Sequence, residues 1–106
     1  MGYIRHDAIV VTSWKENHLA KARDKAAQLG LDVSPFFPSR INGYVTFLIL
    51  PDGSKEGWKP SDAADEAREE WTAWVRGKGD NLYVDFAHVN YGGDEPERAR
   101  LVSFNT

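Results

Sequence analysis

Three ionisable side chains, Arg5-His6-Asp7, run directly into the apolar segment 8–11 near the start of the chain. A histidine between a cation and a carboxylate could act as a general acid or base, or help to hold a ligand. In a β-strand, however, successive side chains point to opposite faces, so His6 cannot share a face with Arg5 and Asp7. We therefore interpret the triplet mainly as the entry of a strand into the core, and keep Arg5 and His6 as candidate binding residues.

The three histidines, His6, His18 and His88, fall on different expected elements, and no two have the spacing of a helical metal motif. The chain contains no cysteine and no serine in a nucleophile motif, so we predict no catalytic residue, no metal site and no cofactor. One pairing can be tested. If the strands of His6 and His88 are antiparallel neighbours, their imidazoles are expected on one face within about 8 Å, close enough for a water bridge.

The loop 54–60, "SKEGWKP", places Trp58 between two lysines and beside the expected start of a helix. An aromatic ring flanked by cations could bind an anionic or planar ligand, and a helix N-terminus also favours negative charge. Trp58 and Lys59 are therefore candidate ligand-binding residues. The simpler interpretation is that Trp58 packs against the helices as a plug.

The elements that position these residues follow the order strand, helix, strand, strand, helix, strand, with an extra C-terminal strand. This order predicts one α+β domain over residues 1–106, with the ferredoxin-like βαββαβ arrangement: an antiparallel sheet with two helices on one face. The first and third strands are expected inside the sheet. The strands are expected at residues 3–12, 33–41, 44–50, 81–91 and 100–104.

Local signals support this order. Pro35 and Pro38 place the second strand at a sheet edge, because proline cannot donate a hydrogen bond to a neighbouring strand. Asn42-Gly43 predicts a type I′ hairpin turn after it. The segment 13–16, "SWKE", has the pattern of a capping box at the start of the first helix, and Ser61-Asp62 begins the second.

With both helices on one side, the opposite side of the sheet is left open. Alternation places Val45, Phe47, Leu82, Val84 and Phe86 in the core, with their neighbours in sequence on the open side. A surface that is neither polar nor fully apolar commonly meets a partner or a ligand. The candidate binding residues on this side are Tyr44, Thr46, Tyr83, Asp85 and Tyr91. His88 is a further candidate, and alternation places it on the same side as Leu82, Val84 and Phe86.

Composition excludes several functional classes. A hydrophobic content of 42% and a charged content of 27% are ordinary for a globular domain. The net charge of −3 argues against general nucleic-acid binding. The segment 42–47, "NGYVTF", resembles the start of the RNP1 pattern of RNA-recognition motifs, but Thr46 replaces a stacking aromatic. No apolar run approaches the roughly 18 residues of a membrane span, so a cytoplasmic location is expected.

Two segments, "MGYIRHDAIVVTSW" and "PDGSKEGWKPSD", together with a second helix that ends in tryptophans, resemble small uncharacterised proteins of tailed phages and prophages of high-GC bacteria. The resemblance covers most of the chain and brings no activity with it. It implies an accessory protein, in the host cytoplasm, that acts on a host protein or on a small nucleotide ligand.

Two hypotheses follow. The first is a non-enzymatic interaction protein, a homodimer or a partner of another protein, that uses the open side of the sheet and the loop 54–60. The alternative resembles the dimeric α+β barrels in architecture: an enzyme with a pocket between sheet and helices. That pocket would use His6, His18, His88 and Asp85 near Trp14 and Trp71. The non-enzymatic hypothesis is favoured.

Overall fold

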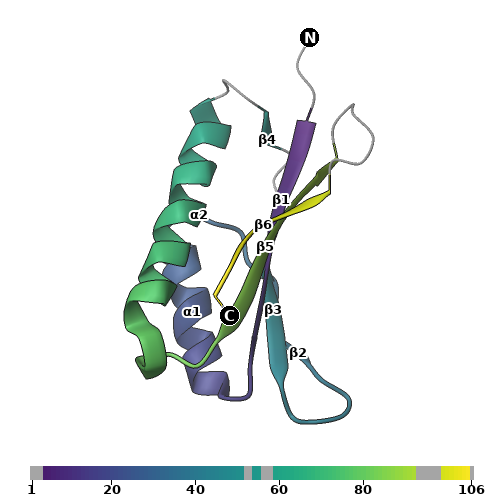
Figure 1. Cartoon of the computed structure of the whole chain (residues 1–106), viewed down its shortest axis with the longest axis vertical. Helices are drawn as coiled ribbons and strands as arrows, with labels where there is room; N and C mark the ends of the chain where they lie inside the picture. The colour runs from purple at the N-terminus through teal and green to yellow at the C-terminus, as the bar shows by residue number, and fades with distance from the viewer. Residues whose placement is uncertain (1–3, 52–53, 56–58, 93–98, 106) are drawn as a thin grey trace.

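The computed structural model describes residues 4–51, 54–55, 59–92 and 99–105. It has two helices on one side of an antiparallel sheet (Figure 1), which confirms the predicted α+β class. The elements in chain order are β1 (Ile4–Ser13), α1 (Glu16–Gln28), β2 (Phe37–Pro38), β3 (Val45–Ile49), β4 (Ser54–Lys55), α2 (Lys59–Lys78), the 3₁₀ helix η1 (Gly79–Asn81), β5 (Asp85–Gly92) and β6 (Arg100–Phe104).

The strands lie in the order β2-β3-β1-β5-β6, and the short β4 pairs with the beginning of β1. The placement of β1 and β3 inside the sheet and of the proline-containing β2 at its edge agrees with the sequence analysis. The strand expected over residues 33–41 is much shorter, however. Only Phe37 and Pro38 pair with β3, and Val33 forms an isolated bridge to Ile49. Two prolines within four residues leave too few donors for a longer ladder.

The capping box expected at residues 13–16 is wrong. Ser13 is still part of β1 and is only 2% exposed. Its hydroxyl donates to the Tyr83 carbonyl and accepts a hydrogen bond from the Lys15 amide at 3.0 Å. Because this hydroxyl already links two segments, α1 begins after Lys15, which is the N-cap and makes no side-chain capping bond.

Two other boundaries also shift. The Asn42-Gly43 turn exists, with Gly43 at φ 75° and the Asn42 side chain accepting from the Tyr44 amide, but it lies within a longer loop between β2 and β3. The strand expected over residues 81–91 begins at Asp85, because η1 extends to Asn81 and the pairing with β1 ends at Asp85.

The core lies between the sheet and the helices, and Trp71 is at its centre. This side chain is fully buried, its indole N–H donates to the Ala22 carbonyl of α1 at 2.9 Å, and its ring meets Phe86 of β5 edge-on at 5.3 Å. One residue of α2 thereby connects the second helix, the first helix and the sheet. Within the described residues, no helix combines the length and apolar character that crossing a bilayer requires.

Candidate functional site

The register of β1 decides which side chains can meet. Ile9 and Val11 have no exposed surface and point toward the helices, and Asp7, two residues earlier, lies on the same face. Val10, which is 39% exposed, points to the opposite side, together with His6. The helix-covered side thus carries Asp7, and the side without helices carries His6.

The predicted pairing of His6 with His88 is wrong, because the two side chains lie on opposite faces. His6 is opposite Tyr91, with ring centroids 5.3 Å apart, whereas His88 is opposite Ile9 on the helix-covered face. Next to His6, Gly92 has φ 87°, and a Cβ there would lie 2.8 Å from the imidazole. Only glycine fits the backbone at that position. The Arg5 side chain lies outside the described residues.

His88 instead pairs with Asp7. The Oδ1 atom of Asp7 lies 3.0 Å from Nε2 of His88 and accepts a hydrogen bond from the side-chain Nδ2 of Asn90 at 2.9 Å. Asp7 is 6% exposed. Burial raises the pKa of Asp7, but the hydrogen bonds from His88 and Asn90 and the charge of Arg68 outweigh it, so the pKa lies below its ordinary value of 3.8. Asp7 is therefore a buried carboxylate that stays ionised at neutral pH.

Arg68 of α2 is a second buried charged residue, beside the Asp7–His88 pair. It is 1% exposed, and its Nη1 atom donates to Asp65 at 2.9 Å. The position of Arg68 is signalled in the sequence, since it lies four residues after Ala64 and three before Trp71, on the buried stripe of the helix. The Asp7–His88 pairing was missed because it depends on the register between two strands.

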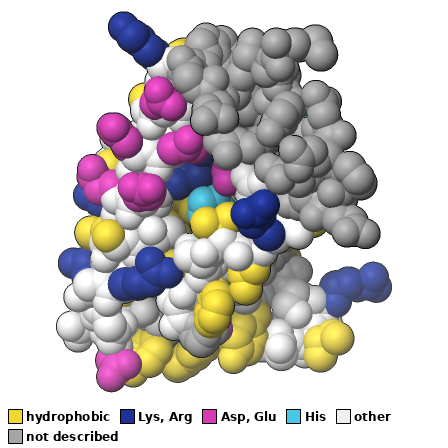
Figure 2. Space-filling view, turned by 45° about the horizontal axis from the view of Figure 1, so that its top comes forward, with side chains coloured by type: hydrophobic (Ala, Val, Ile, Leu, Met, Phe, Trp, Pro, Cys, Tyr) yellow, Lys and Arg dark blue, Asp and Glu magenta, His cyan; other side chains and the backbone are white. Residues whose placement is uncertain are grey.

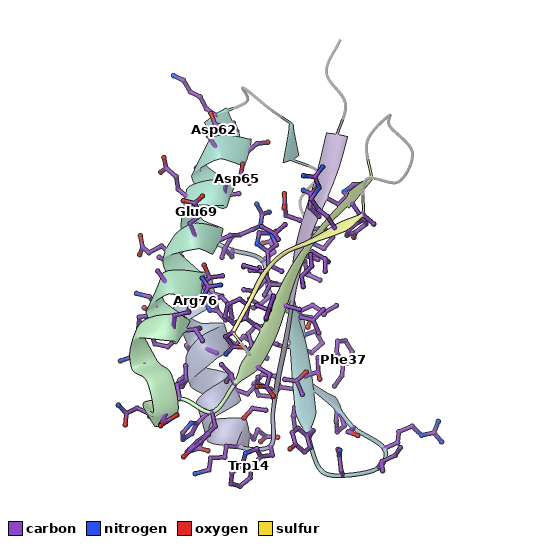
Figure 3. All side chains as sticks on the ribbon, viewed as in Figure 1. Trp14, Phe37, Asp62, Asp65, Glu69 and Arg76 are labelled. Carbon is purple, nitrogen blue, oxygen red and sulfur yellow. The ribbon has the colours of Figure 1, made fainter. Side chains whose placement is uncertain are left out.

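Asp7 and Arg68 line a hollow of about 630 Å³ between α2 and β6, which we call the α2–β6 groove. Figure 2 shows a histidine surface at its bottom, between acidic side chains on one side and basic ones around it. Asp65 and Glu69 occupy the upper part of α2 and Arg76 lies farther down that helix (Figure 3). The lining of the α2–β6 groove also includes Asp7, Arg68, Thr72, His88, Asn90, Arg100 and Ser103.

The α2–β6 groove could support general-base chemistry. When Nε2 of His88 carries the proton that bonds Asp7, Nδ1 is left as a proton acceptor. Ser103 is the cross-strand neighbour of His88 on β6, next to a register shift between His88 and Val89. Bulges of this kind are over-represented beside active sites.

The side of the sheet without helices, which we call the open face, is largely apolar. Phe37 of β2 is 50% exposed and points away from the helices (Figure 3). Leu101 and Phe104 of β6 are 54% and 51% exposed, opposite Val89 and Ala87. Among the side chains that the structure describes on this face, Asp85 is the acidic one and His6 the basic one. The open face consists of His6, Ala8, Val10, Thr12, Phe37, Thr46, Leu48, Asp85, Ala87, Val89, Tyr91, Leu101 and Phe104, and Tyr44 lies just before β3.

The register confirms the predicted position of Thr46, Asp85 and Tyr91 on the open face, but their role in binding stays a prediction. His88 lies on the helix-covered face with Phe86, as the alternation along this strand predicts. Lys59 begins α2 and is exposed, while Trp58 and its predicted role as a ligand contact or plug lie outside the described residues.

A cluster of aromatic rings lies where β1 passes into α1, and we call it the aromatic end. Trp14 and Tyr83 are 57% and 46% exposed, with ring centroids 6.1 Å apart. The Lys15 ammonium lies 4.9 Å from the centroid of each ring. The sequence analysis included Tyr83 but not Lys15, because the pairing of these rings depends on where β1 ends.

His18 fixes one side of the aromatic end. Its ring stacks on Tyr83 at 5.7 Å, and its Nδ1 accepts a hydrogen bond from the Tyr83 amide at 2.9 Å. Loss of hydration, together with the charges of Lys15 and Lys21, lowers the pKa of His18 below its ordinary value. The ring is therefore mainly neutral at pH 7.

Comparison with known proteins gives no further guide: no family model, no curated protein and no solved structure matches this chain. Its function is therefore argued from its own geometry.

Proposed function

We propose that this chain is a non-enzymatic interaction protein whose open face docks against a second copy of itself. The observation behind the proposal is the run of half-exposed apolar side chains on the uncovered side of the sheet, including Val10, Phe37, Leu101 and Phe104. Contiguous apolar surface of this kind marks an interface more often than a free surface.

A second copy is the occupant that this chemistry favours. The described side chains of the open face offer almost no charge for a polar partner to match. Such a face packs best against another flat apolar surface, and a second copy of the chain has such a surface. Two sheets can pack face to face about 10 Å apart, and a two-fold axis makes the same residues meet on both sides. If the chain is phage-encoded, as its resemblance implies, the pair would present its remaining surfaces to a host component.

We also infer that the fold is an elaborated ferredoxin-like sheet. The internal position of β1 and β3 and the two helices on one face support this inference. The strands β4 and β6 are additions to a four-stranded plan, and β6 widens the open face.

The test is the oligomeric state. The wild-type chain of 11.9 kDa is expected to sediment at twice that mass. Replacing both Leu101 and Phe104 by Asp should weaken association by on the order of 100-fold or more, because charge would be buried in an apolar interface. The control replaces Ala27 of α1 and Ala73 of α2 by Asp, since both residues are exposed and belong to the helices, on the other side of the sheet (Figure 1). A monomeric wild type, or equal effects of both changes, would contradict the proposal.

A second candidate, acid–base catalysis in the α2–β6 groove, is favoured by one observation: Asp7 holds one nitrogen of His88, and Ser103 lies across from it. A fluorophosphonate is a suitable probe, because Oγ of Ser103 would attack phosphorus, fluoride would leave, and His88 would take the hydroxyl proton. Labelling is expected at Ser103 in the wild type and should be absent in Ser103→Ala. It should slow on the order of 100-fold in Asp7→Asn. An unlabelled wild type removes this candidate.

A further inference from the structure

The aromatic end already holds a cation that comes from its own chain. The Lys15 ammonium is equidistant from the Trp14 and Tyr83 rings, at 4.9 Å from each centroid, while the centroids are 6.1 Å apart. Distances under about 6 Å are those at which the negative face of an aromatic ring attracts a cation. We call Trp14 and Tyr83, whose rings share this one ammonium, the pincer.

The position of Tyr83 in this pincer does not depend on Lys15. The Tyr83 backbone is fixed at both its polar groups, because its amide donates to His18 and its carbonyl accepts from Ser13. The His18 ring stacks on the Tyr83 ring as well. The Tyr83 ring is therefore expected to keep its position when the lysine side chain leaves.

The surroundings favour a positive ligand. A hollow of about 530 Å³ adjoins the pincer, and its lining includes Tyr44, Asp80 and Asp85. Arg76 also lines it, but the guanidinium donates to the Phe104 carbonyl at 3.1 Å and lies over the Phe86 ring. His18 is mainly neutral at pH 7, as its lowered pKa indicates. The charged groups that line this hollow are thus two carboxylates and one guanidinium, a net negative charge.

We propose that the aromatic end is a binding site for a methylated ammonium group, which enters between Trp14 and Tyr83 and displaces the Lys15 side chain. A lysine ammonium is strongly hydrated. Each methyl group replaces one N–H, and a quaternary ammonium has none left to donate to water, so it gives up its hydration more readily. Quaternary ammonium ligands are the class that aromatic cages recognise best. Lys15 acts as a built-in competitor that keeps the rings occupied when no ligand is present.

The experiment titrates choline into the full chain and follows the indole and tyrosine signals by NMR. Lys15→Gln removes the competitor and is expected to tighten choline binding about tenfold. Lys25→Gln is the matched control, because Lys25 is a lysine of the same helix that lies over Trp74 instead, and the net charge changes equally. Its affinity should equal that of the wild type. Trp14→Ala should weaken binding at least tenfold without loss of folding, since Trp14 is 57% exposed.

A neutral ligand of the same shape separates cation recognition from simple apolar contact. 3,3-Dimethylbutanol has a tert-butyl group in place of the trimethylammonium of choline, and it is expected to bind at least tenfold more weakly. Equal binding of both ligands would overturn the proposal. So would equal affinities of the two lysine variants, or a Trp14→Ala chain that binds choline as well as the wild type does.

Discussion

Trp71→Ala is expected to remove a large part of the free energy of unfolding. The wild-type ring is fully buried among both helices and the sheet, so its removal opens a cavity that no neighbour can fill. Large-to-small changes of this kind cost roughly 3–5 kcal/mol. A domain of 106 residues has a free energy of unfolding of only about 5–15 kcal/mol. Urea denaturation followed by circular dichroism measures the loss.

Two controls define the cause. Trp71→Phe keeps most of the apolar volume but loses the indole N–H that donates to Ala22, so a smaller loss of about 1–2 kcal/mol is expected. Trp14→Ala removes the same side chain from an exposed position and should change the free energy of unfolding by about 0.5 kcal/mol or less. A mild effect of Trp71→Ala, similar to that of Trp14→Ala, would show that the core is not organised around this residue.

Asp7→Ala is expected to have the second large effect, on the order of 3 kcal/mol, because it removes the acceptor of two side chains and a charge beside buried Arg68. Asp7→Asn is the informative comparison. The hydrogen bonds from His88 and Asn90 both reach Oδ1, which asparagine retains, so this variant loses the charge but keeps an acceptor. It should lose about half as much stability as Asp7→Ala.

The pH dependence of the unfolding free energy isolates the contribution of the Asp7 charge. The pKa of Asp7 in the folded protein lies below 3.8, so the unfolded chain takes up its proton first as the pH falls. The stability that ionised Asp7 contributes is therefore complete well above pH 3.8 and is lost as the pH falls from there through the folded pKa. The difference in unfolding free energy between the wild type and Asp7→Asn should shrink over that range. A difference that stays constant would show that the charge is not involved.

Much of the fold could be predicted from the sequence because its signals are local. The apolar run of β3, the stripe that contains Trp71 and the prolines of β2 each determine an element from a few adjacent residues. The capping box failed for the opposite reason. Ser13 has the right residue type, but its hydroxyl is used by Tyr83, which is 70 residues away along the chain.

The candidate sites were harder to predict because they depend on strand register. Residues 8–11 of β1 are all apolar, so alternation cannot tell which of them face the helices. A slip of one residue exchanges the two faces. That ambiguity led to the pairing of His6 with His88 and concealed the pairing of His88 with Asp7. The meeting of Trp14, Lys15 and Tyr83 likewise requires β1 and β5 to be in their final alignment.

The two strands at the ends of the order β2-β3-β1-β5-β6 differ in how readily they can pair with a strand of another molecule. On the β6 side, five successive residues follow one another without a proline, so an extended chain can hydrogen-bond there. On the β2 side, a two-residue strand containing Pro38 offers almost nothing to extend. If two molecules join by their β6 strands, the resulting ribbon has a β2 strand at each extremity. Polymerisation along the hydrogen-bonding direction would then stop at two molecules, which protects the chain from fibril formation by that route.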